Sequence, residues 1–257
     1  MFRYIIKKLI ACPVTYLGAL TLCLAMIFSI ESDHDSMPAY IFDYVFATGF
    51  PSQLLPVAVV LPIAYIRHAI QTSSAWQFPL LHSTPLRYTL GGLAAAFASG
   101  AFVMLLSAGG FHLYVVLFLK GPISYDYTLF DHIYFYTHFS NRVGYLIRIG
   151  FQVVTSGMYA ILAYGVSGLS SNQYLCAAFP FAFKIAVSVF AGAAAAALPA
   201  KYRVISVLDP GQLNNYGYYT SAAKDGGLSY VALYVLIVAL LSGGGFYLRL
   251  KRRLRDG

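Results

Sequence analysis

Six apolar stretches divide this sequence, and each is about as long as a helix that crosses a membrane. They cover residues 14–30, 50–66, 88–119, 149–169, 174–198 and 228–248. A membrane-spanning helix needs about 20 mostly apolar residues, with a range of about 17 to 25. The pattern predicts an all-α polytopic membrane protein with six transmembrane helices, in which residues 1–257 form a single transmembrane domain.

The residues before the first stretch show a different, amphipathic pattern. Apolar side chains recur at helical spacing from Phe2 to Ile10, and the bases Arg3, Lys7 and Lys8 occupy the opposite face. This pattern predicts a short interfacial helix over residues 1–12, with its bases toward the lipid headgroups. The alternative is that these residues are only the basic flank of the first span.

Composition agrees with a membrane protein. The chain is 59% hydrophobic and only 10% charged, with a formal net charge of +8. This leaves too little polar surface for a soluble globule of 257 residues,. The net charge does not indicate a nucleic-acid partner, because the basic residues flank the apolar stretches and form no exposed face.

The charges are sorted by sign between the two sides of the predicted spans. If the N-terminus is cytoplasmic, eight of the nine acids fall outside, and ten bases fall inside: Arg3, Lys7, Lys8, Arg67, Arg87, Arg249, Lys251, Arg252, Arg253 and Arg255. Cytoplasmic loops are enriched in Lys and Arg near the span ends. We therefore expect a multi-pass protein of the plasma or inner membrane with both termini in the cytoplasm.

Two spans contain residues that disturb a helix. The second contains Pro51, Pro56 and Pro62, which predict a kink because proline lacks a backbone N–H,. The last contains three consecutive glycines at 243–245, where we expect the helix to lose regularity.

Lys184 lies near the middle of the fifth span. A charge at this depth is costly unless it faces water or the interior of a helix bundle, so Lys184 is a candidate position on a transport pathway. The alternative is that it snorkels or pairs with a group on a neighbouring helix.

No pattern in the sequence indicates catalysis. The glycine-rich positions lack the Lys-Ser/Thr ending of a phosphate-binding loop, and Ser167 does not stand in a nucleophile elbow,. His132 and His138, near Asp131, are too few and too widely spaced for a metal site,. We expect no catalytic residue, no metal site and no cofactor bound by this chain.

The segment 67–87, between the second and third spans, is apolar for a cytoplasmic loop. Trp76, Phe78 and Leu80 need a surface that covers them, which predicts a docking partner,. The alternative is that the rings of Trp76 and Phe78 rest in the inner membrane interface. In this segment the chain resembles the integral-membrane subunits of ABC-2-type transporters, whose corresponding loop carries an acid, a small residue near an aromatic, Leu-Leu-x-x-Pro and then a base. Here Gln71, Ser74, Trp76, the run 80–85 and Arg87 stand in those places.

The resemblance extends to the topology. The tight turn between spans four and five, the helix ahead of span one and an outer segment over 199–227, expected to be structured, are also similar to that family. The resemblance to this family implies an ABC-2-type, type V exporter-like fold. It also implies a permease subunit that exports a peptide such as a bacteriocin, a lipid or a drug. The chain would pair with a second copy or a sister permease among membrane lipids.

The resemblance also implies a separate ABC ATPase subunit that binds ATP and Mg and contacts a coupling loop at 67–87, through Gln71, Ser74, Trp76, Phe78 and Leu80. Gln71 replaces the usual acid, so a salt bridge to the ATPase is not expected. The alternatives are a structural or assembly subunit of a larger membrane complex and, with less support, a membrane-embedded enzyme.

Overall fold

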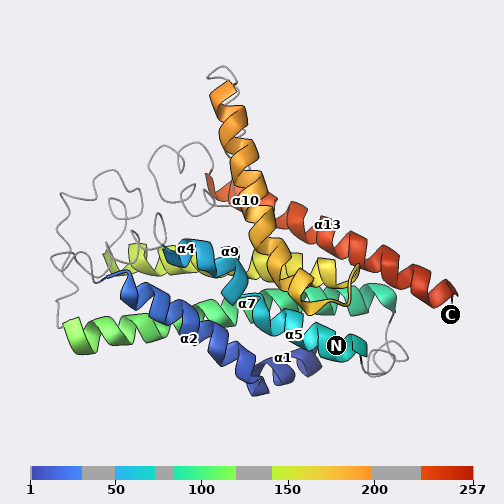
Figure 1. The fold of residues 1–257 in the computed structure, drawn as a ribbon, viewed down its shortest axis with the longest axis horizontal. Helices are drawn as coiled ribbons and strands as arrows, with labels where there is room; N and C mark the ends of the chain where they lie inside the picture. Colours follow the sequence, from blue (N-terminus) through green and yellow to red (C-terminus); the bar gives the residue numbers. More distant parts are fainter. Residues whose placement is uncertain (1, 31–49, 73–83, 120–140, 198–226, 257) are drawn as a thin grey trace.

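The structure is a computed structural model that describes residues 2–30, 50–72, 84–119, 141–197 and 227–256. These residues are almost entirely helical, as predicted (Figure 1). The helices are α1 (Phe2–Ala11), α2 (Pro13–Phe28), α4 (Phe50–Ala58), α5 (Leu61–Thr72), α7 (Pro85–Tyr114), the π-helical turn η2 (Val115–Leu119), α9 (Asn141–Ser167), α10 (Gln173–Ala197) and α13 (Gly227–Asp256).

Five segments of the described chain are long and apolar enough to cross a membrane. They are Phe50–Thr72, Pro85–Phe118, Leu146–Ser167, Gln173–Ala194 and Val231–Arg255. The first predicted span corresponds to α2, which has only 16 residues. It passes the same test together with α1, to which it is joined at a bend of 60°. The described chain therefore has five candidate spans, or six when the bent pair counts as one.

The bend between α1 and α2 lies at Pro13, which occupies the first turn of α2. On α1, Ile5 and Leu9 are buried, whereas Lys7 and Lys8 are exposed. The Thr15 hydroxyl donates to the Leu9 carbonyl oxygen at 2.7 Å, which joins the two helices. The predicted amphipathic helix is therefore present, and its place at a membrane surface stays a prediction.

The second span is interrupted where its prolines predict. Helix α4 ends at Ala58, a turn follows at 59–60, and α5 begins at Leu61 with Pro62 in its first turn. Proline is tolerated in a first turn because the N–H groups there have no partner within the helix. Helix α5 then continues to Thr72, so the connection to α7 is shorter than the predicted loop 67–87.

The expectation for the last span was wrong. Helix α13 runs without interruption from Gly227 to Asp256, through all three glycines. Gly243 lies against α7, where an added Cβ would come 2.6 Å from the Cδ1 atom of Leu93. Small residues allow helices to approach closely in membranes, so at least this glycine serves packing.

The helices other than α10 form one group, and both termini lie toward the same end of it (Figure 1). The α5 and α7 ends that face the undescribed segment 73–83 lie at the same end, as does the short turn from α9 to α10. Helix α10 leaves this group at a steep angle. The tight turn predicted between spans four and five is present, but it does not produce an antiparallel hairpin, because α10 turns steeply away from α9 (Figure 1). Asn172 caps α10 by accepting from the backbone N–H of Tyr174 at 2.9 Å.

Candidate functional site

The shared end of the helix bundle contains a buried arginine. Arg67, near the end of α5, is only 3% exposed. Its Nε atom donates to the Ser167 hydroxyl at 3.3 Å, and Nη1 donates to the Tyr88 hydroxyl at 3.1 Å. The side chain thus connects the end of α5 with the end of α9 and the start of α7.

Aromatic rings fix the same guanidinium group. The rings of Tyr164 and Phe246 stack with centroids 4.5 Å apart. The Cζ atom of Arg67 lies 5.1 Å from the Tyr164 centroid and 5.0 Å from the Phe246 centroid. Both distances allow a cation–π attraction, which is strongest where water is excluded. These contacts also bring α13 into the cluster, because Phe246 belongs to that helix.

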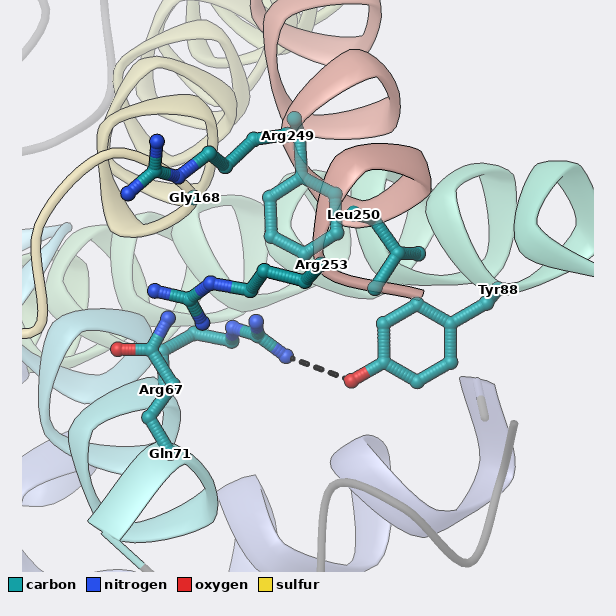
Figure 2. Close-up of a pocket in the computed structure, with 8 residues that line it drawn as sticks. Arg67, Gln71, Tyr88, Gly168, Arg249, Leu250 and Arg253 are labelled. Carbon is teal, nitrogen blue, oxygen red and sulfur yellow. Dashed lines mark hydrogen bonds between the residues drawn. The ribbon is translucent and has the colours of Figure 1, made fainter. Parts of the chain in front are cut away.

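A small pocket opens beside this arginine (Figure 2). Its walls come from α5, α7, α13 and the turn after α9, and its lining residues are Arg67, Gln71, Tyr88, Gly168, Phe246, Arg249, Leu250 and Arg253. Three of the eight are arginines and none is acidic. In Figure 2 the Arg253 guanidinium group lies near the Arg67 guanidinium group and the neutral Gln71 amide, whereas the Arg249 guanidinium group lies farther off, beside Gly168.

Gln71 was predicted to contact an ATPase, and the structure places it in this pocket. Its Nε2 atom donates to the Ser167 carbonyl oxygen. One turn earlier, Nδ1 of His68 lies 2.8 Å from the Ser171 carbonyl oxygen. Both contacts hold the end of α5 against the turn between α9 and α10. The Gln71 side chain is therefore engaged within the chain, and its coupling role stays a prediction.

The other predicted coupling residues, Ser74, Trp76, Phe78 and Leu80, lie outside the described residues. The same holds for the outer segment 199–226 and for His132 and His138. The end of α5 and the start of α7, which flank the undescribed segment 73–83 within the predicted coupling loop, lie at the same end of the bundle (Figure 1). Residues of both helices also line the basic pocket.

Lys184 is 7% exposed and lies far along the chain from its partners on α4. Its Nζ atom donates to the Ser52 carbonyl oxygen at 2.6 Å and to Oε1 of Gln53 at 3.1 Å. These hydrogen bonds between α10 and α4 agree with the alternative that Lys184 pairs with a group on a neighbouring helix. They do not test whether Lys184 also borders a transport pathway.

Sequence reasoning missed the pocket because it counted Arg67, Arg249 and Arg253 as basic flanks of spans. One signal was present for Arg67: the apolar, helical pattern continues past it through Ile70. Three arginines line this pocket, and guanidinium groups match the geometry of carboxylate and phosphate oxygens, so the pocket is suited to binding an anion,.

Comparisons with known proteins found no match: no family model, no curated protein and no solved structure is similar to the chain at a significant level. The functional argument therefore rests on the sequence pattern and on the geometry of the described residues.

Proposed function

We propose that this chain is the membrane-spanning permease subunit of an ABC-2-type exporter, with a type V exporter-like fold. Two permease halves, identical or sister chains, would expose the interface between them alternately to the two sides of the membrane. A separate ABC ATPase would bind ATP and Mg and supply the energy. The exported substrate would be a peptide, a lipid or a drug.

The observation that carries the proposal is the position of the connection between α5 and α7. Its two edges lie at the end of the bundle that holds both termini, the α9–α10 turn and the basic ends of α5 and α13 (Figure 1). By the positive-inside bias this is the cytoplasmic end. A soluble ATPase reaches only that side, and the segment 73–83 offers it Trp76, Phe78 and Leu80.

The helix ahead of the first span adds support. Helix α1 is amphipathic and meets α2 at a bend of 60°, as expected for a helix that lies along the membrane surface before the chain enters it,. A structural or assembly subunit of a larger complex would need neither this helix nor the apolar connection. The coupling contact is therefore what separates the two functions.

The test is purification of the full-length chain from its native membrane, followed by measurement of ATP hydrolysis in the purified material. We expect an ATP-hydrolysing subunit to accompany the chain. Replacement of Trp76 and Phe78 together by alanine is expected to release that subunit or to uncouple its ATP hydrolysis from transport, because aromatic anchors typically contribute more than about 1 kcal/mol each to an interface.

A matched control is the replacement of Leu248 and Leu254 by alanine, since both side chains are exposed on the last turns of α13, outside the predicted coupling loop. This pair removes similar apolar surface near the same end of the bundle and should retain the ATPase. If the wild-type chain carries no ATPase, or if the Trp76 and Phe78 variant retains it with coupled transport, the exporter proposal is wrong.

A further inference from the structure

The pocket of Arg67, Arg249 and Arg253 gathers positive charge with no compensating negative charge among the residues that line it. The nearest acid in sequence on α13 is Asp256, and it is not one of the lining residues. Like charges that converge on one hollow repel each other unless an anion lies between them. The paired N–H donors of a guanidinium group match the oxygens of a phosphate group in geometry as well as in charge.

The size of the pocket limits what enters it. The cavity volume is about 30 Å³. A water-sized group needs about 10–15 Å³ of such a cavity, so about two groups of this size fit. Two phosphate oxygens can therefore enter while the rest of the molecule stays outside. An exported peptide or drug does not fit into this space.

The depth of the pocket points to a lipid as the source of that phosphate. Its walls come from the ends of apolar spans: the last turns of α5 and α13, the first turn of α7 and the residue just after α9. This is the level at which lipid headgroups lie when the spans cross a membrane. Basic pockets between transmembrane helices at the cytoplasmic face are a known type of binding site for anionic headgroups.

The buried arginine is already held in position for such a ligand. Arg67 is fixed by Ser167, by Tyr88 and by two aromatic rings, so little side-chain freedom is lost when an anion binds,. Arg249 and Arg253 both line the pocket from exposed positions on α13. The Arg253 guanidinium group lies near that of Arg67, and the Arg249 side chain, which lies beside Gly168, would have to turn toward the phosphate to complete the clamp (Figure 2).

We propose that this pocket binds the phosphate of an anionic phospholipid headgroup, with Arg67 as its fixed base and Arg249 and Arg253 as its outer clamp. The lipid links the ends of α5, α7 and α13 at the membrane surface. This inference does not depend on the export function, because it uses only the pocket and its place at the ends of the spans.

The test is native mass spectrometry of the full-length protein in detergent, titrated with phosphatidylglycerol and, separately, with phosphatidylcholine. We expect tighter binding of phosphatidylglycerol. The double variant Arg249→Gln and Arg253→Gln should weaken that binding at least about tenfold, because a hydrogen bond to a charged group contributes about one factor of ten or more. Arg67 is left unchanged, because its substitution is expected to disturb folding.

The matched control is the double variant Lys251→Gln and Arg252→Gln. It removes the same charge from the same turns of α13, at exposed positions that do not line the pocket. It should bind phosphatidylglycerol like the wild type. Equal weakening in both variants would overturn the proposal, because the net charge of α13 would then explain the binding.

Two further outcomes would also overturn it. Millimolar inorganic phosphate that binds through the same arginines, without a preference for phosphatidylglycerol, would assign the pocket to a free phosphate. A pocket variant that keeps its lipid but loses a co-purifying protein would assign these arginines to a protein contact.

Discussion

At the scale of single residues, Lys184 supplies a hydrogen-bond donor that α4 lacks. In an α-helix the carbonyl of residue i accepts from the N–H of residue i+4. For Ser52 that residue is Pro56, which has no N–H,. The Nζ atom of Lys184 donates to this same carbonyl oxygen at 2.6 Å. The lysine from α10 thus donates to a carbonyl oxygen whose i+4 residue, Pro56, cannot donate,.

This relation predicts a thermodynamic coupling between positions 184 and 56. Lys184→Met should lower the free energy of unfolding by about 1 kcal/mol, the size typical of a hydrogen bond between helices in a membrane. In a Pro56→Ala background the loss should be smaller, because the new N–H at position 56 can bond to the Ser52 carbonyl. Reversible unfolding of the four proteins in mixed micelles measures the coupling. Equal losses in both backgrounds would show that Lys184 does not replace the missing donor.

The transport role of Lys184 is a separate prediction. If its charge also borders a pathway, Lys184→Met in the Pro56→Ala background should alter transport, or substrate-stimulated ATP hydrolysis by the partner subunit, at near-normal stability. Unchanged transport in that background would leave Lys184 with its structural role alone.

At the scale of helices, the most extensive contact is the one between α7 and α9. It depends on a close approach at Gly100, where an added Cβ would lie 2.3 Å from the Ser156 carbonyl oxygen and 2.8 Å from its carbonyl carbon. These are backbone atoms of α9, so they cannot turn aside as a flexible side chain can. The two helices would have to move apart.

Gly100→Ala should therefore destabilise the protein by about 1–3 kcal/mol, the usual cost of overpacking. Gly109→Ala is the control on the same helix, because a Cβ there meets nothing within 4 Å. It should raise the free energy of unfolding by about 0.5–1 kcal/mol, because alanine is favoured over glycine inside a helix. The measurement is denaturation of both variants in the same detergent. Similar values for the two would show that the close approach at Gly100 is not required for stability.

The helices themselves could largely be predicted from the sequence, because the rule that governs them is local. Backbone polar groups in lipid must bond within their own helix, so apolar stretches of sufficient length become helices. The turn at 59–60 and the bend at Pro13 follow from proline in the same local way. The uninterrupted course of α13 did not follow, because it depends partly on the contact of Gly243 with Leu93 on α7.

The candidate site could not be predicted in this way. Arg67 directly follows one apolar stretch and Arg87 directly precedes the next, so both look like the basic flank of a span in the sequence. Yet Arg67 is buried and Arg87 is exposed. What separates them is the packing of Ser167, Tyr164 and Phe246 around Arg67, and these residues are about 100 or more positions away. Such contacts arise only when the helices are assembled.

At the scale of the whole molecule, the ends of the helices agree with an even number of crossings. Both termini lie at one end of the bundle, together with the edges of the 73–83 segment and the α9–α10 turn (Figure 1). With five candidate spans elsewhere in the described chain, an even number is reached when the bent pair of α1 and α2 is counted as a sixth. Large apolar side chains are exposed along α2, α10 and α13, as expected for surfaces that contact lipid chains,.

The orientation predicted from the charges can be tested by labelling single cysteines from each side of the membrane. Cys12, Cys23 and Cys176 are first replaced, since all three thiols are free. A cysteine at Ser171, an exposed position in the α9–α10 turn, should react with a membrane-impermeant reagent only from the cytoplasmic side,. A cysteine at Asp35, in the segment between α2 and α4, should react only from the outer side. If both react from the same side, at least one of the three spans between them, α4–α5, α7 or α9, does not cross the membrane. If each reacts from the side opposite to that expected, the basic pocket lies on the outer face, where an ATPase does not reach it.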